Sequence, residues 1–104
     1  MAVRLRLLLS RRGISVEVVA LLNSGYEAPT PQLLIPVNLA RSLGLWPPEG
    51  ATEVLMDTAG SPLRAWLYPR AATMKVVAPD AESREVVVDL VVSPLADEPL
   101  ISAC

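Results

Sequence analysis

The residues best suited to chemistry in this sequence follow an apolar run. Residues 20–22, Ala-Leu-Leu, lead into the tetrapeptide Asn23-Ser24-Gly25-Tyr26. Its amide and hydroxyl can form hydrogen bonds, and Gly25 tolerates backbone angles that other residues avoid. Asn23 carries no proton that titrates near neutral pH, so it cannot act as a general base. Asn, Ser and Gly are also common turn formers, which leaves an ordinary turn as the alternative interpretation.

Carboxylates supply the other candidates for chemistry. Asp57 precedes Thr58-Ala59-Gly60, and this segment can be interpreted either as an Asp-Thr-Gly motif interrupted by Ala59 or as a β-turn with a capping Asp. Glu82, Glu85 and Asp89 lack the spacing of a calcium-binding loop and indicate a charged hairpin tip. The sequence therefore predicts no metal site and no cofactor.

The amino acids that are missing exclude several classes of site. The chain has no His, which excludes histidine-based catalytic triads and His-ligated metals. Cys104 is the single cysteine, so disulfide frameworks and Cys-x-x-Cys zinc sites are excluded as well. Without a His partner, Cys104 is also a poor candidate for a thiol protease.

Composition predicts one globular domain over residues 1–104, since 52% of the residues are apolar. The net charge is −2, and nothing aromatic separates the basic residues near the N-terminus, so we expect a solvated edge strand and turn there, and no nucleic-acid partner. No apolar run reaches the ~18 residues of a membrane span, and no secretion signal is convincing. We therefore expect a cytoplasmic protein without membrane contact.

Alternating and apolar runs predict seven short strands and one helix. Ten prolines and 4% aromatic residues favour short segments around an aliphatic core. Pro36 suits the first position of a helix, and Gly44 suits its end. We predict a closed all-β barrel of antiparallel strands with one short helix. The expected strands cover residues 3–9, 14–22, 33–35, 53–57, 63–68, 74–77 and 86–92, and the expected helix covers 37–43; residues 23–31 are expected to form a loop.

Several segments resemble, in order, those of the retropepsin-like aspartic proteases of small archaeal and bacterial type. Asn23-Ser24-Gly25-Tyr26 is similar to their Asp-Thr-Gly-Phe motif, and residues 34–45 are similar to their Leu-Pro, short-helix and Leu-Gly-Leu segment. Residues 57–61 resemble the Ala-Asp-Gly turn that precedes the flap hairpin. Residues 97–102 resemble the Pro-Leu-Ile-Gly segment, with Ser102 in place of the glycine.

The resemblance implies a retropepsin-like fold and a homodimer in which each protomer contributes one active-site loop. Asn23, Ser24 and Gly25 would form that loop, while Tyr26, Asp57 and Gly60 would contact a peptide. In the family the paired Asp residues share one proton and activate water. With Asn23 in place of Asp, we expect an inactive, peptide- or protein-binding dimer. The alternative is an active endopeptidase, which would need Asp at position 23 through deamidation or engineering, a partner subunit that carries Asp, or a catalytic role for Asp57. A purely structural barrel is a third possibility.

Overall fold

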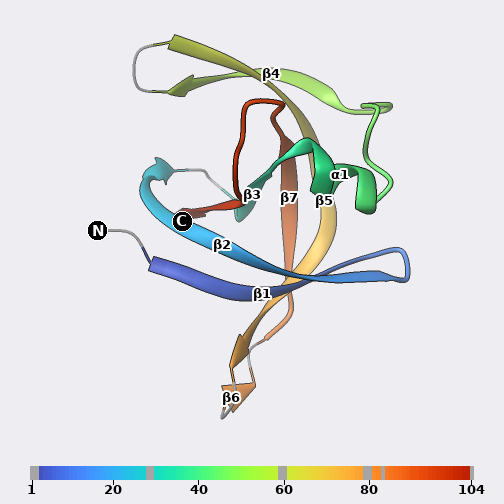
Figure 1. Cartoon of the computed structure of the whole chain (residues 1–104), viewed down its shortest axis with the longest axis vertical. Helices are drawn as coiled ribbons and strands as arrows, with labels where there is room; N and C mark the ends of the chain where they lie inside the picture. Colours follow the sequence, from blue (N-terminus) through green and yellow to red (C-terminus); the bar gives the residue numbers. More distant parts are fainter. Residues whose placement is uncertain (1–2, 28–29, 59–60, 79–80, 83, 104) are drawn as a thin grey trace.

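The computed structural model describes residues 3–27, 30–58, 61–78, 81–82 and 84–103, and for residues 23–27, 56–58, 61–63, 81–82 and 103 it describes the backbone alone. Figure 1 shows the arrangement of the strands and of the helix. Strands and helix follow in the order β1 (Val3–Arg11), β2 (Ile14–Glu27), β3 (Gln32–Ile35), α1 (Val37–Ser42), β4 (Thr52–Thr58), β5 (Ser61–Ala78), β6 (Ala81–Glu82), β7 (Val86–Val92) and β8 (Leu100–Ala103).

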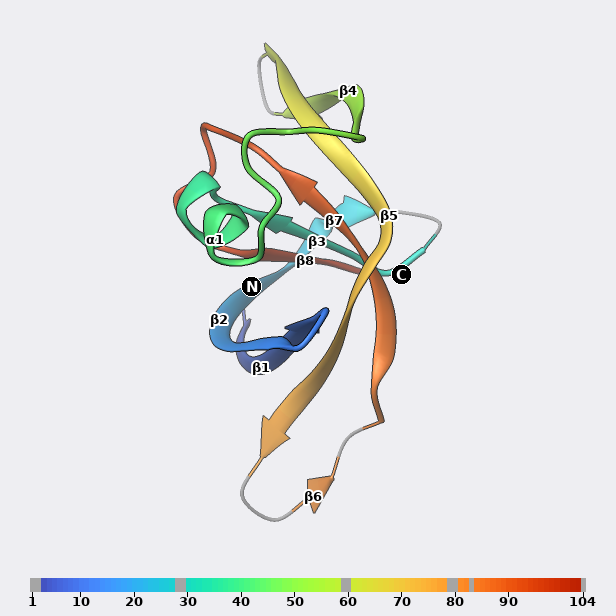
Figure 2. The same cartoon turned by 90° about the vertical axis from the view of Figure 1, so that its right-hand side faces the viewer.

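Six of these strands close into a barrel. Their order is β1-β2-β8-β3-β7-β5, and β5 pairs again with β1, so that the sheet returns on itself. β4 lies outside the ring and forms a hairpin with β5, while β6 adds a short pairing at the other end of β5. Figure 2 shows β5 running the length of the molecule between these two extensions. The predicted closed barrel is therefore confirmed, and so is the short helix.

The prediction of antiparallel strands is wrong for two of the pairings. β2 and β8 are parallel, and so are β3 and β7. Hairpin spacing can predict only neighbours joined by a tight turn, and those are antiparallel by construction. Both parallel pairings join strands from opposite ends of the sequence, so no local turn could indicate them.

The barrel interior is filled by aliphatic side chains. Alternate residues of β1 point inward, and Leu7 and Leu9 are almost completely buried. Leu33 and Ile35 of β3 meet Leu90 of β7 in the same cluster. Closing the ring thus buries one face of each strand. A second buried cluster lies on the other face of β3, β5 and β7 and consists of Leu34, Ala65 and Val91.

The helix begins at Val37, as predicted, and ends at Ser42, one residue before the predicted end. Pro36 is the N-cap of α1, and its carbonyl accepts a hydrogen bond from the Ala40 N–H at 3.1 Å. Gly44 has a φ of +74°, which glycine adopts without the steric cost that a side chain would add. The helix is six residues long, and in the described part of the chain no helix has the length and hydropathy needed to cross a bilayer.

Candidate functional site

The end of β2 lies beside β8 inside the barrel wall. Leu22 pairs with Ile101, and Asn23 pairs with Ser102, in parallel register. The Leu21 N–H donates to the carbonyl of Pro99 at 2.9 Å and fixes the start of this pairing. β8 in turn pairs with β3 on its other side. The backbone of Asn23 is therefore held by a strand that lies between β2 and the strand that follows it in sequence.

The segment after Asn23 differs from the predicted loop. β2 continues through Glu27, so the expected loop over residues 23–31 is in large part a strand. The pairing is nevertheless irregular, because Asn23 pairs with Ser102 whereas Glu27 pairs with the next residue of β8, Ala103. Residues 24–26 of β2 therefore have no pairing partner in β8, because β8 advances by only one residue between these two pairs. This segment forms a bulge that contains Ser24, Gly25 and Tyr26.

Ser102 is buried next to this bulge and binds β3. Only 6% of Ser102 is exposed. Its Oγ accepts a hydrogen bond from the Gln32 N–H at 2.9 Å. Because Gln32 is the first residue of β3, this hydrogen bond attaches the start of β3 to β8, the strand that pairs with Asn23. The residue in place of the family's glycine is therefore a buried serine whose hydroxyl is bound to β3.

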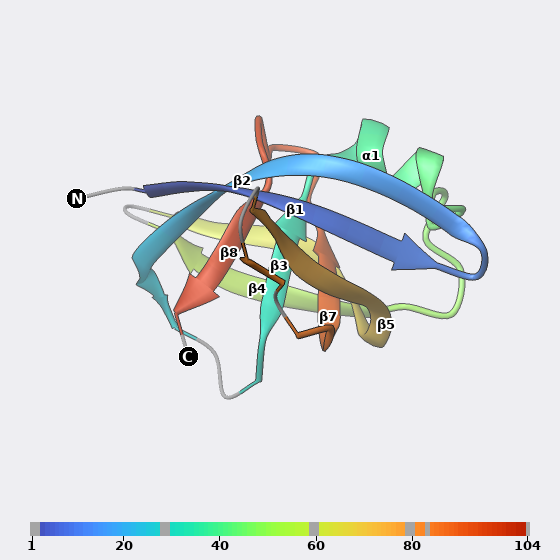
Figure 3. The same cartoon turned by 90° about the horizontal axis from the view of Figure 1, so that it is seen from below.

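Of the two other residues of the predicted binding set, the structure describes Asp57, which belongs to the β4–β5 hairpin. Asp57 is in β4, where its backbone pairs with that of Pro62. Gly60 lies outside the described residues. Figure 1 and Figure 3 both place this hairpin at the same end of the barrel as the end of β2. The fold thus brings the β2 bulge and the hairpin to one end of the molecule, although they are about 30 residues apart in sequence.

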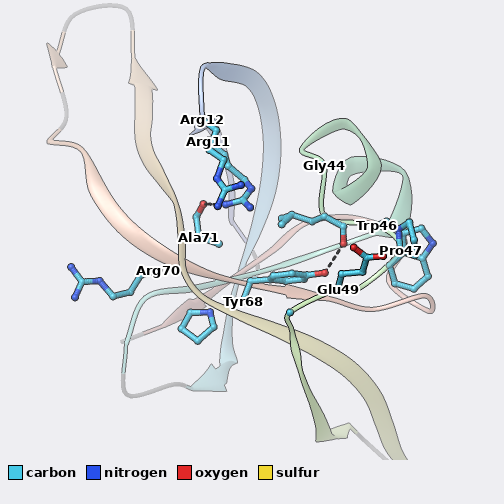
Figure 4. A pocket seen from close by; sticks show the side chains of 12 residues that line it. Arg11, Arg12, Gly44, Trp46, Pro47, Glu49, Tyr68, Arg70 and Ala71 are labelled. Carbon is cyan, nitrogen blue, oxygen red and sulfur yellow. Dashed lines mark hydrogen bonds between the residues drawn. The ribbon is translucent and has the colours of Figure 1, made fainter.

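A cavity of about 570 Å³ lies at the opposite end, where sequence analysis predicted no site. The β1–β2 turn, the chain after α1, and the middle of β5 form its walls (Figure 4). A second, shallower hollow adjoins it and shares Arg11, Arg12, Arg70 and Ala71 with it. The residues lining the first cavity are Arg11, Arg12, Gly44, Leu45, Trp46, Pro47, Glu49, Gly50, Tyr68, Pro69, Arg70 and Ala71.

Two hydrogen bonds fix the walls of this cavity. Arg11 donates from Nη1 to the carbonyl of Ala71 at 3.0 Å. Tyr68 donates from its hydroxyl to the carbonyl of Leu45 at 2.6 Å, and that bond is buried. Trp46 packs edge-to-face on Trp66, with ring centroids 5.5 Å apart. The aromatic wall and the position of the Arg11 guanidinium are therefore set by the fold.

The charges around the cavity are mostly positive. Arg11, Arg12 and Arg70 line it together with one carboxylate, Glu49. Burial lowers the pKa of Arg11 from its ordinary value, the neighbouring Arg12 lowers it further, and Tyr68 acts weakly in the opposite direction. Burial also raises the pKa of Tyr68, while Arg11 lowers it and Glu49 raises it. The ion pairs between described residues involve other arginines, namely Arg4, Arg6 and Arg64.

Two of these arginines have unusual backbone conformations. Arg12 has a φ of +46° and is followed by Gly13 at +81°, so both central residues of the β1–β2 turn are left-handed. Arg70 has a φ of +50° at the point where the pairing of β5 with β7 shifts register. Among the described non-glycine residues, these two alone have positive φ. A side chain in this conformation carries a steric cost of about 1 kcal/mol or more.

Sequence analysis missed this cavity because its parts are scattered along the chain. The sequence predicted a solvated edge strand and turn at Arg11 and Arg12. The turn is correct, since Arg12 forms it with the glycine that follows, but Arg11 is the half-buried last residue of β1, which pairs with both β2 and β5 and is not an edge strand. Tyr68 and Arg70 come from another hairpin, and Glu49 comes from the connector after the helix. The Arg-Gly pair in a two-residue turn was the one signal available, since such turns usually contain Asn-Gly or Asp-Gly.

Among the residues that the structure describes, no group of three or more Asp, Glu or Cys side chains could hold a metal ion. No family model matches the sequence, and no curated protein matches it.

Proposed function

We propose that this chain is a retropepsin-like aspartic protease homologue without catalytic activity, and that it acts as a peptide- or protein-binding homodimer. The observation that supports this most is the backbone position of Asn23. Asn23 lies within β2, pairs in parallel with Ser102 of β8, and directly precedes a bulge that contains Ser24 and Gly25. The resemblance implies an apolar strand that runs into an active-site loop, and here the apolar part of β2 runs into this irregular polar segment.

The other segments of the resemblance are placed consistently with this proposal. Residues 34–45 form the end of a strand, the helix α1 and the glycine that ends it. The β4–β5 hairpin lies at the end of the barrel where β2 ends (Figure 1), and it contains Asp57 and Ser61 of the segment that resembles the Ala-Asp-Gly turn. Leu55 of this hairpin is 73% exposed, so it offers an apolar contact to a peptide or to a second protomer.

The side chain at position 23 is the reason to propose binding without cleavage. A dimer would place two amides where the chemistry needs two carboxylates that share a proton. An amide cannot take a proton from water, and loss of a general base costs about 10²–10⁴ in rate. The alternative, an active endopeptidase with Asp at position 23 or in a partner subunit, predicts cleavage wherever that Asp is supplied.

The test is a comparison of the unaltered chain with Asn23→Asp. We expect the unaltered chain to leave a mixed peptide library intact between pH 4 and pH 7, and Asn23→Asp to cleave it with an acid optimum. A statine-type inhibitor should block that cleavage. Asn38→Asp is the matched control, because it makes the same chemical change at an exposed position of α1 and should remain inactive.

Two results would contradict the proposal in different ways. Cleavage by the unaltered chain, with mass spectrometry showing that Asn23 has not deamidated, would favour the endopeptidase alternative. If the folded Asn23→Asp variant neither cleaves peptides nor binds the inhibitor, the retropepsin-like assignment of this end of the barrel is wrong.

A further inference from the structure

The cavity at the β1–β2 turn is a second candidate site, remote from the end of β2. Figure 4 shows Arg11 and Arg12 lying together above the ring of Tyr68, with Glu49 on the side of Trp46. We propose that this cavity binds a small molecule that carries a phosphate group, with the phosphate held by Arg11 and Arg12. This inference does not depend on the proposed function.

Charge is the first argument for an anionic ligand. The whole chain has a net charge of −2, yet this cavity collects Arg11, Arg12 and Arg70 against the single carboxylate of Glu49. The positive charges of neighbouring arginines repel each other, and a bound anion between them would reduce this repulsion. Arg11 is already oriented by the Ala71 carbonyl, so part of the entropy cost of ordering its side chain is paid before a ligand arrives.

The geometry of the groups favours phosphate. Guanidinium groups present planar forks of N–H donors that match phosphate oxygens in pairs. Glu49 repels an anion from the Trp46 side of the cavity, which leaves the Arg11 and Arg12 side for the phosphate. The volume of about 570 Å³ lies within the ~300–1,000 Å³ typical of small-molecule sites. The rest of the ligand would lie against Tyr68 and Pro47, with a hydroxyl or amino group available to Glu49.

The backbone strain is an independent argument. Arg12 and Arg70 both adopt left-handed conformations that Asn or Gly would adopt at lower cost. The bulge at Arg70 is held by Asp89, whose Oδ1 accepts the Arg70 N–H at 2.8 Å while Oδ2 accepts the Thr30 hydroxyl at 2.7 Å. Strained residues that persist tend to cluster where function requires their side chains. In Figure 4 the Arg70 side chain points away from Tyr68, so we assign it a weaker, outer role.

Isothermal titration calorimetry at low ionic strength tests the proposal, with inorganic pyrophosphate as the probe and citrate as an anion of different geometry. We expect saturable pyrophosphate binding, weaker citrate binding, and loss of affinity as salt is added. Arg12→Asn should lower the affinity by about 10- to 100-fold, as expected for loss of a hydrogen bond between charged groups. Arg70→Asn should lower it less, and Glu49→Gln should raise it.

Folding does not confound this test. Asn-Gly is the preferred pair for a turn with two left-handed residues, so Arg12→Asn should be at least as stable as the parent chain. Arg64→Asn is the matched control, because it removes the same charge from an exposed ion pair with Glu53 in the β4–β5 hairpin. Its pyrophosphate affinity should remain close to that of the parent.

Several results would overturn the proposal. These are no saturable binding up to about 10 mM pyrophosphate, an equal loss in Arg12→Asn and Arg64→Asn, or citrate binding as tightly as pyrophosphate. Binding of a single-stranded oligonucleotide that is tighter than that of pyrophosphate and insensitive to Arg12→Asn would assign the positive surface to nucleic acid instead.

Discussion

Single side chains join segments that are far apart in this sequence. Tyr68 is the clearest case, because its ring lines the cavity while its hydroxyl donates to the Leu45 carbonyl, 23 positions away. The bond is short and buried, and Tyr68 is 8% exposed. The hydroxyl of Tyr68 thus helps to attach the chain after α1 to β5, in addition to the packing of Trp46 on Trp66.

Replacing Tyr68 with Phe should destabilise the fold. The Leu45 carbonyl would lose its donor inside the protein, which costs about 1–3 kcal/mol of unfolding free energy. Urea unfolding measures this change. Ser42→Ala is the control, since it removes an exposed hydroxyl that donates to Asn38 at 3.3 Å, and it should change stability by less than about 0.5 kcal/mol. Equal effects in the two variants would contradict a special role for Tyr68.

The same residue predicts an alkaline dependence of stability. Burial raises the folded-state pKa of Tyr68 above its ordinary value of 10.0. Between the unfolded and the folded pKa the native state holds more protons, so the unfolding free energy falls as pH rises. This contribution is complete below the unfolded pKa and is lost as pH passes the folded pKa. The measurement is the unfolding free energy at a series of pH values around the Tyr68 pKa. In Tyr68→Phe, this free energy should fall less steeply with rising pH than in the parent chain.

At the scale of elements, β8 is the strand that organises the candidate site at the end of β2. It pairs in parallel with β2 and antiparallel with β3, so it separates two strands that are consecutive in sequence. Ser102 stabilises the contact between β8 and β3, because its hydroxyl accepts a hydrogen bond from the Gln32 N–H. The bulge after Asn23 is thus supported on one side by a strand that comes from the other end of the chain.

Substitution of Ser102 should loosen this junction. Ser102→Ala removes the acceptor for the Gln32 N–H and should cost about 1–2 kcal/mol of unfolding free energy. Ser102→Gly, which restores the residue that the resemblance implies, should cost about 0.5–1 kcal/mol more because glycine loses more backbone entropy. Thermal unfolding gives both values, with Ser15→Ala as an exposed strand control. A Ser102→Gly variant as stable as the parent chain would show that the hydroxyl is dispensable.

At the scale of the whole molecule, the barrel has two ends with different chemistry. One end holds the β2 bulge and the β4–β5 hairpin, and the other holds the arginine-lined cavity (Figure 1, Figure 4). β5 connects them, since its first part pairs with β4 in the hairpin and its middle, residues 68–71, lines the cavity. The proposed binding functions can therefore be altered independently of each other.

The proposed function requires a dimer, because one copy of the β2 bulge would supply half of a retropepsin-like site. Twofold assemblies are the commonest oligomers of soluble proteins. Light scattering at micromolar concentration should therefore give twice the chain mass of 11.1 kDa. If this end of the barrel forms the interface, Leu55→Glu on the exposed face of the β4–β5 hairpin should weaken the dimer. Leu95→Glu is the control, because Leu95 is equally exposed but lies in the loop after β7. A monomer at every concentration tested would contradict the proposed dimer, and with it the binding site that two protomers would share.

The sequence by itself determined the local structure. Alternation predicted the β1–β2 and β4–β5 hairpins, and Pro36 with Gly44 predicted where α1 begins and ends, because these signals depend on neighbouring residues and on backbone sterics. The polar segment at residues 23–26 was also visible as a candidate, although its backbone proved to be a bulge in β2. The closed barrel followed from the number and spacing of the strands.

Only the tertiary structure decided how distant segments meet. The parallel pairings of β2 with β8 and of β3 with β7 depend on strand order, which hairpin spacing does not encode. The cavity required Arg11, Glu49 and Tyr68 to converge from three separate segments. Such contacts arise when closing the barrel buries its apolar face, and that burial is a property of the whole chain.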